Sequence, residues 1–167
     1  ERYHIIVIDC VTEGQAATAM LAAAYWDEDK PLLIYNIDTY VEPGEMNSSQ
    51  LKGDGFIPCF QARGDHWSFV RTDVKGRAVE VKEKQRISGD CTLGAYYFRT
   101  CRLYKSLYYA YYGGTGHLVH GEKYVAPLYN YLIEQGGDVY ISNIRREKVH
   151  VMEMPEELHE FLSEGKI

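Results

Sequence analysis

The stretch that most constrains the fold is a short apolar run within residues 31–43, PLLIYNIDTYVEP. Asp38 ends the run, and Pro43 and Gly44 follow as turn-forming residues. A continuous apolar run with turn signals at its end is typical of a buried central strand of an α/β sheet. Ligands of such sheets bind beyond the carboxyl ends of the strands. We therefore expect Asp38 to lie where a ligand would bind.

The carboxylate of Asp38 has two interpretations. The run offers it no side-chain cation, so a metal ion or a substrate hydroxyl is a natural partner. The alternative is a strand-end aspartate that caps the following turn. The stretch by itself favours neither.

Composition limits the class of protein. The chain has 167 residues, 46% of them apolar, with no internal repeat and no linker, which predicts one globular domain over 1–167. A net charge of −6 argues against general nucleic-acid binding, which needs a basic face. No apolar run is long enough to cross a membrane, so we expect no membrane partner. Four widely spaced cysteines favour free thiols and a cytoplasmic location.

The segment before the apolar run predicts a strand, a turn and a helix. Residues 3–9 form the predicted strand. Thr12 and Gln15 match a capping box, with Thr12 as the N-cap of a helix over 15–26. Together with the apolar run, these elements predict a βαβ unit with a parallel strand pair. Free N–H groups in the Thr12–Gly14 turn suit an anion or a polar base edge.

The remaining chain alternates between strand and helix patterns. Strands are predicted over 56–62, 67–72, 77–84, 91–98, 139–144 and 148–152, and helices over 101–112, 123–135 and from Pro155 onward. The strands 67–72 and 77–84 form a predicted hairpin. Pro58 places the first of the strands at a sheet edge or a bulge, because proline cannot donate to the ladder.

Two groups of polar residues could belong to sites. Glu83 shares a predicted strand face with Val79 and Val81, an unusual place for a charge, and Lys84 follows it. The alternative for this pair is an ordinary solvated strand end. His117 and His120 lie close together but are too few for a metal site by themselves.

Six segments occur in the order found in a known family: VTEGQAATAML, LLIYNIDTY, VEVKEKQ, CTLGAYYF, GEKYVAPLYNYLIEQG and MPEELHEFL. In this ordered set the chain resembles the sugar-1-phosphate nucleotidyltransferases of the glucose-1-phosphate thymidylyltransferase and capsule-sugar type. The resemblance covers nearly the whole chain. It implies an α/β fold, a Rossmann-like three-layer sandwich with a mixed, mainly parallel sheet and helices on both sides.

The resemblance also implies a reaction. Such enzymes join a sugar 1-phosphate to a nucleoside triphosphate and release pyrophosphate, with Mg²⁺ holding the phosphates, here for surface-polysaccharide synthesis. Asp38 corresponds to the catalytic Mg²⁺ ligand, and Lys84 to the lysine that grips the sugar phosphate. Thr12, Gly14 and Gln15 correspond to the turn that contacts the nucleotide. These roles agree with phosphoryl transfer, which depends on positioning and on cancellation of charge.

Three further residues correspond to the substrate-binding positions of the family. Glu83 would hold a sugar hydroxyl. Gly94 would let the sugar approach the strand, and Glu122 would bind the sugar at the start of the late helix.

The chain departs from the family pattern in three places. The glycine-rich signature that holds the triphosphate is absent and would precede Glu1, so we expect an N-terminally truncated domain that is inactive by itself. Val151 stands where the family often has an aspartate as second metal ligand. Gln85 replaces the proline that usually follows the Glu-Lys pair.

Two other functions remain open at this point. One is a non-catalytic relative that binds a nucleotide sugar. The other is a metal-dependent glycosyltransferase of the related fold, which normally carries D-x-D where this chain has Asp38-Thr39-Tyr40. The nucleobase, the sugar, the use of choline phosphate in place of the sugar, and a homo-oligomeric state are not decided by the sequence.

Overall fold

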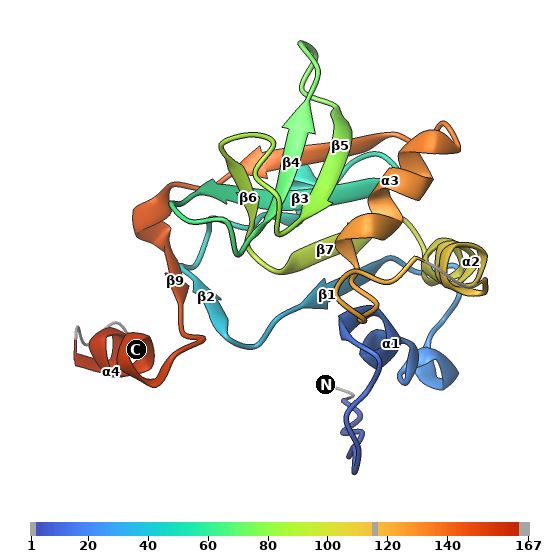
Figure 1. Cartoon of the computed structure of the whole chain (residues 1–167), viewed down its shortest axis with the longest axis horizontal. Coiled ribbons are helices and arrows are strands. Elements are labelled where there is room, and N and C mark those ends of the chain that lie inside the picture. Colours follow the sequence, from blue (N-terminus) through green and yellow to red (C-terminus); the bar gives the residue numbers. More distant parts are fainter. Residues whose placement is uncertain (1–2, 115–116, 164–167) are drawn as a thin grey trace.

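A computed structural model describes residues 3–114 and 117–163 (Figure 1). Its main sheet has seven strands, with the path β1-β7-β3-β6-β4-β5 and β8 on the other side of β3. These strands are β1 (Leu32–Tyr35), β3 (Gly55–Gln61), β4 (Ser68–Thr72), β5 (Ala78–Glu83), β6 (Asp90–Thr92), β7 (Ala95–Phe98) and β8 (Val139–Asn143). A second, two-stranded sheet pairs β2 (Thr39–Val41) with β9 (Val149–Val151).

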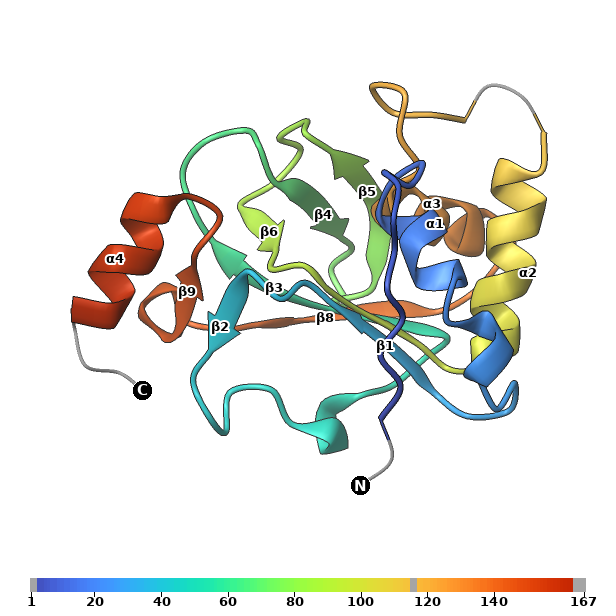
Figure 2. The same ribbon diagram turned by 90° about the horizontal axis from the view of Figure 1, so that it is seen from below.

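The described helices lie in two groups. They are α1 (Gln15–Met20), α2 (Cys101–Tyr112), α3 (Ala126–Glu134) and α4 (Pro155–Ser163), with short 3-10 turns at Ala23–Tyr25, Ser48–Gln50 and Arg146–Lys148. Figure 2 shows α1, α2 and α3 gathered at one end of the main sheet and α4 beside β9 at the other. No described helix is both long and apolar enough to cross a bilayer.

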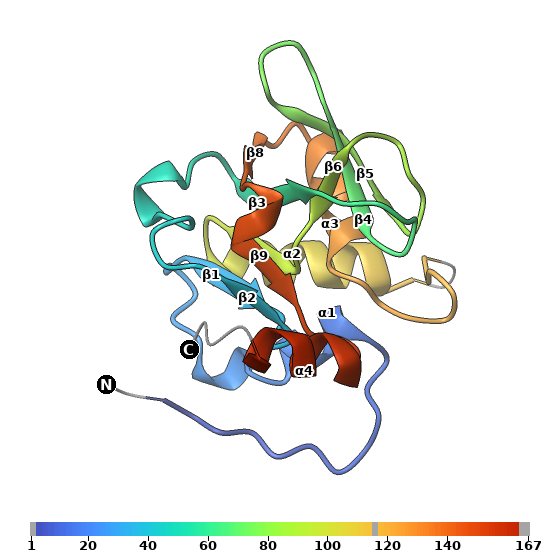
Figure 3. The same cartoon turned by 90° about the vertical axis from the view of Figure 1, so that its left-hand side faces the viewer.

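The main sheet is largely antiparallel, so the prediction of a mainly parallel sheet was wrong. The pairing of β3 with β8 is parallel, and the other pairings of the described sheet are antiparallel. The predicted βαβ unit does not form. Residues 3–10 are irregular and pair with no described strand, and Val7 is 89% exposed. Figure 3 shows this segment running along the outside of the molecule.

The apolar run forms β1, but at the edge of the described sheet and not at its centre. Its side chains alternate between half-buried and exposed, with Leu33 49% and Tyr35 40% exposed. The reason is that β1 pairs only with β7 among the described strands, so one of its edges stays open. Asp38 lies in the turn that joins β1 to β2.

Pro58 was predicted to lie at a sheet edge or a bulge; it lies in the central strand β3, so the edge alternative was wrong. The first residues of β3, Gly55 and Phe56, pair with β7, whereas residues 59–61 pair with β6. Pro58 falls between these two antiparallel ladders, and in the parallel ladder with β8 it lies opposite Ser142. The proline therefore marks the change of partner strand.

The helix after residue 14 is shorter than predicted and lacks the capping box. Gly14 is its N-cap and supplies no side-chain bond, and Thr12 Oγ1 lies 2.5 Å from Thr18 Oγ1 instead. By contrast, the predicted β4–β5 hairpin and the helices α2, α3 and α4 are confirmed. The predicted strand 91–98 is divided into β6 and β7 by Gly94, which has a φ of +81°.

The core has two parts on opposite faces of the main sheet. Cys59 and Val70 belong to the first part, which packs against α1, α2 and α3. Their neighbours Phe60 and Phe69 point the other way, into a second part that includes Val149 of β9. Among the described residues the second face is thus covered by the small sheet and loops. This arrangement leaves space between α1, the β1–β2 turn and the β4–β5 hairpin.

Candidate functional site

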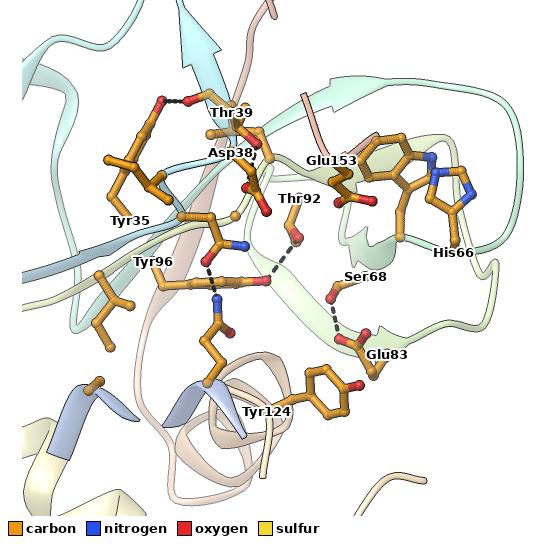
Figure 4. A pocket seen from close by; sticks show the side chains of 18 of the residues that line it. Tyr35, Asp38, Thr39, His66, Ser68, Glu83, Thr92, Tyr96, Tyr124 and Glu153 are labelled. Atoms are coloured by element: carbon orange, nitrogen blue, oxygen red, sulfur yellow. Dashed lines mark hydrogen bonds between the residues drawn. The ribbon is translucent and has the colours of Figure 1, made fainter. Parts of the chain in front are cut away.

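A cavity of about 750 Å³ opens where α1, the β1–β2 turn, the start of β4, the end of β5 and the β6–β7 connection meet (Figure 4). This volume is in the range of small-molecule sites. Its side chains with polar or aromatic groups are Gln15, Thr18, Tyr35, Asn36, Asp38, Thr39, His66, Trp67, Ser68, Glu83, Lys84, Thr92, Tyr96, Tyr124 and Glu153.

Asp38 faces this cavity from the end of the β1–β2 turn. Thr39 Oγ1 lies 3.5 Å from its Oδ1, and the carboxylate is only half buried. Figure 4 shows the carboxylates of Asp38 and Glu153 turned toward the same space. Met152 N donates a hydrogen bond to Asp38 O at 2.7 Å. This bond joins the β1–β2 turn to the segment that leaves β9.

Glu153 was missed by the sequence analysis. Val151, at the position compared with a metal-binding aspartate, pairs with Thr39 inside the small sheet. The chain then turns, and the carboxylate of Glu153, two residues later, reaches the cavity. The signal that could have found it is an acid two positions after Val151.

The carboxylates of Asp38 and Glu153 are oxygen donors of the kind that Mg²⁺ accepts. Among the residues that the structure describes, no three His, Cys, Asp or Glu side chains gather as a metal cluster. Mg²⁺ is commonly bound through one or two carboxylates together with substrate phosphates and water. Asp38 and Glu153 supply that kind of donor set.

Glu83 lies opposite Ser68 in the β4–β5 ladder, and the Ser68 hydroxyl donates a hydrogen bond to it. Burial raises the pKa of Glu83, although Ser68 and the nearby Lys84 act against the shift. Val81 is buried as expected, but Val79 is 39% exposed. A register shift between Arg71 and Thr72 places Ala78 in the core in place of Val79.

Lys84 brings a cation to the same cavity. Its Nζ donates to the Tyr124 hydroxyl at 3.0 Å and lies 5.1 Å from the centre of that ring. The hydrogen bond to Tyr124 raises the pKa of Lys84. Its backbone has a φ of +52°, a left-handed conformation that is uncommon for lysine. Tyr124 was not singled out from the sequence.

Gln15 and Gly94 meet at Asn36, a further residue that the sequence analysis missed. Gln15 Nε2 donates to Asn36 Oδ1 at 2.5 Å, and Val125 N donates to Gln15 Oε1 at 3.4 Å. A Cβ on Gly94 would lie 2.8 Å from Asn36 Nδ2. Gly94 thus makes room for the Asn36 amide.

Three of the predicted site residues do not line the cavity. Gly14, with a φ of +119°, packs so closely that a Cβ would lie 2.8 Å from backbone atoms of Lys123. Thr12 bonds to Thr18, and Glu122 is exposed before Lys123. Glu122 lies near Tyr124, where burial raises the pKa of the phenol and the Glu122 carboxylate adds to the shift. The structure therefore brings together Gln15, Asp38, Glu83, Lys84 and Gly94.

Tyr96 forms an inner wall of the cavity. It is 4% exposed, and its hydroxyl lies 3.1 Å from Thr92 Oγ1. Burial raises the pKa of Tyr96 to about 12, so the phenol stays protonated. His117 and His120 do not line this cavity; His117 packs on the ring of Tyr111.

Comparisons with known proteins give structural matches. No family model and no curated sequence matches the chain. An inositol-1-phosphate CTP transferase from T. maritima has 13% identity and a TM-score of 0.67, with 92% of this chain and 61% of that chain covered. A CTP:phosphocholine cytidylyltransferase from Streptococcus pneumoniae has 10% identity and a TM-score of 0.65, with 90% and 63% covered. Both show a shared fold, and this chain spans less than two thirds of each.

A third structure is more similar in sequence. It is the nucleoside-diphosphate-sugar pyrophosphorylase from Vibrio cholerae RC9, with 30% identity and a TM-score of 0.82. The match covers 93% of this chain and 67% of that chain. At this identity and coverage the likeness extends beyond the fold. The chain belongs to the nucleoside-diphosphate-sugar pyrophosphorylase family.

Proposed function

We propose that the protein is a nucleotidyltransferase that joins a sugar 1-phosphate, or a similar phosphate, to a nucleoside triphosphate and releases pyrophosphate. One observation carries the proposal: Asp38, from the β1–β2 turn, and the Glu83-Lys84 pair, from the end of β5, line one cavity. Family membership and the fold neighbours support the same kind of reaction.

In the proposed reaction an acceptor phosphate oxygen attacks the α-phosphorus of the nucleotide. The bond between the α-phosphorus and the bridging oxygen breaks, and pyrophosphate leaves with the electron pair. The Lys84 ammonium would hold the acceptor phosphate, and the Glu83 carboxylate would accept a hydrogen bond from an acceptor hydroxyl. Fixing the acceptor in line with the breaking bond is the main contribution that a protein makes to such a transfer.

Asp38 and Glu153 would hold Mg²⁺, which supplies Lewis-acid cancellation of phosphate charge when bound. Gln15 would contact the nucleotide, with Thr12 and Gly14 fixing the turn before it. Gly94 would leave room for the Asn36 amide in the cavity wall. Glu122 would bind the sugar from a position near Tyr124, outside the residues that line the cavity. We also propose that the product serves surface-polysaccharide synthesis, which the resemblance alone supports.

The experiment is a pyrophosphate-release assay with Mg²⁺ on the full-length protein. Four nucleoside triphosphates are each combined with glucose 1-phosphate, inositol 1-phosphate or choline phosphate. The proposal expects release that requires one nucleotide and one acceptor together. Absence of release in every combination would contradict it.

A second candidate is a non-catalytic relative that binds a nucleotide sugar. The observation that favours it is Val151 in the small sheet, where the resemblance expects a metal-binding aspartate. Thermal-shift titration separates the two candidates. A nucleotide sugar that raises the melting temperature of a protein without turnover would support the second one.

A further inference from the structure

Helix α4 packs on the rest of the described structure through one buried side chain. Phe161 is 4% exposed, and every other residue of the helix is exposed. The side-chain hydrogen bonds found for α4 among the described residues are local: Met154 N donates to Glu157 Oε2, and Ser163 Oγ donates to Glu160 O. The position of α4 therefore depends on where the Phe161 ring packs.

Phe161 packs on two rings of the small sheet. Its ring centre lies 5.2 Å from that of Tyr40 and 5.1 Å from that of His150, and these two residues face each other across β2 and β9. His150 Nε2 lies 3.3 Å from Glu42 Oε1, and Lys148 Nζ donates to Glu42 Oε2 at 2.5 Å. The small sheet thus holds both rings in place, and Phe161 seats α4 beside β9 (Figure 2).

The short connection between β9 and α4 carries Glu153. On the β9 side, Met152 N donates to Asp38 O at 2.7 Å. On the α4 side, Leu158 N donates to Met154 O at 3.2 Å, so Met154 belongs to the first turn of the helix. Glu153 is the one residue between these two held positions, and its side chain lines the cavity (Figure 4). The direction of this side chain therefore depends on α4 as well as on the small sheet.

Glu153 has little packing of its own to orient it, because the residue is exposed. A side chain loses rotamer freedom when its carboxylate binds a cation, and a ligand whose backbone is already held loses less on binding. Groups that orient a metal ligand from outside the site commonly change metal affinity by about an order of magnitude or more. Phe161 does not line the cavity, but in this way it can act on it.

We propose that Phe161 is a positioning residue: by seating α4 on Tyr40 and His150, it holds the Glu153 carboxylate in the cavity and strengthens the binding of a divalent cation there. This inference rests on the proposed function, in which Glu153 contributes to the metal site. Phe161 acts through Glu153 and through no contact with substrate.

The first test asks whether Phe161 anchors the helix, by hydrogen exchange on the full-length protein. In Phe161→Ala the backbone amides of residues 156–163 should exchange at least about 10-fold faster, and those of β3 should keep the wild-type rate. Leu162→Ala is the matched control, because Leu162 lies on the same helix and is 57% exposed. It should leave exchange in α4 unchanged. Wild-type exchange of α4 in Phe161→Ala would overturn the inference.

The second test measures cation affinity without turnover. Mn²⁺ alone is the probe, since it accepts the same carboxylate oxygens as Mg²⁺ and its EPR signal falls as it binds. Phe161→Ala should raise the Mn²⁺ dissociation constant about 3- to 10-fold, and Phe161→Leu, which keeps an apolar anchor, should recover most of the affinity. Leu162→Ala should bind Mn²⁺ as the wild type does.

A double-mutant cycle then separates positioning from a general structural role. If Phe161 acts through Glu153, Phe161→Ala should not weaken Mn²⁺ binding further in a Glu153→Gln background. An equal loss in both backgrounds, or no loss in either, would overturn this inference and leave the proposed function standing. Equal Mn²⁺ affinity of the wild type and Glu153→Gln would remove Glu153 from the metal site and contradict this inference with it. A wild type that releases no pyrophosphate in any combination would contradict the proposed function instead.

Discussion

Ser68 and Glu83 lie directly opposite each other across the β4–β5 pair, and the serine hydroxyl donates to the glutamate carboxylate. This single bond does not compensate for burial, which raises the pKa of Glu83. A partly desolvated carboxylate in a cavity can be satisfied by a ligand hydroxyl. The pair thus links the local packing of a hairpin to the proposed acceptor site.

Glu83→Gln should make the protein more stable and less active at neutral pH. Burial raises the pKa of Glu83 in the folded state, so ionisation of this side chain lowers the stability of the fold. The loss of stability is absent well below pH 4.5, the ordinary pKa, and complete above the raised pKa. Glutamine keeps the bond from Ser68. Melting temperature should therefore rise at pH 7 and stay unchanged near pH 3.5, while KM for the acceptor rises about 10-fold.

Glu80→Gln on the same strand is the contrasting control. Its pKa is lowered by the hydrogen bond from Arg71, so its ionised form favours folding above the ordinary pKa and this contribution disappears in acid. This variant should be slightly less stable at pH 7. The interpretation of Glu83 fails if both variants shift the melting temperature in the same direction.

The backbone conformation of Lys84 should lower the free energy of unfolding, and a glycine at this position should remove that loss. Its φ of +52° is left-handed, a conformation that costs a residue with a Cβ about 1 kcal/mol. Lys84→Gly should therefore be about 1 kcal/mol more stable than Lys84→Ala in denaturant unfolding, because both lose the same bond to Tyr124. Both should lose pyrophosphate release alike. Equal stability of the two variants would mean that the conformation is unstrained.

Gly94→Ala should impair both stability and activity, since a Cβ would lie 2.8–3.0 Å from Asn36 atoms. Gly44→Ala is its matched control: φ there is +90°, but a Cβ would meet nothing within 4 Å. Both should lose about 1–2 kcal/mol of stability from the left-handed backbone. Only Gly94→Ala should also raise KM for the substrates. Normal kinetics in Gly94→Ala would show that Asn36 has no part in binding.

Glu153→Gln should weaken the response to Mg²⁺. We expect the Mg²⁺ concentration for half-maximal rate to rise about 10-fold, a typical effect of losing one supporting ligand. Glu156→Gln, an acid in the first turn of α4 that does not line the cavity, serves as control. An identical Mg²⁺ titration for both variants would remove Glu153 from the metal site.

Local patterns predicted much of the fold, but strand partners did not follow from them. Alternation in 67–72 and 77–84 gave the hairpin, and the proline at position 155 marked the start of α4. Whether β1 runs parallel or antiparallel to its neighbour depends on which strand it pairs with. Its partner is β7, some 60 residues later in the chain, and no local pattern encodes this pairing. The same holds for Pro58, whose place in β3 depends on two partner strands.

The candidate site was predicted in part, for a similar reason. Glu83 ends a strand, and Asp38 and Lys84 follow strands, so their position at a sheet end could be inferred from the sequence. Glu153 enters the cavity only because β9 pairs with β2. Asn36 becomes part of the wall only through its contacts with Gln15 and Gly94. These residues depend on tertiary contacts and carry no motif of their own.

In the proposed function, Asp38 takes part in a metal-dependent transfer of a nucleotidyl group. The most direct measurement is Mg²⁺-dependent pyrophosphate release by wild type, Asp38→Asn and Asp29→Asn. Asp29 is an exposed aspartate paired with Arg102 outside the cavity. We expect Asp38→Asn to lose about 10²–10³-fold in rate and Asp29→Asn to keep the wild-type rate. Wild-type activity in Asp38→Asn would contradict a role of Asp38 in the transfer.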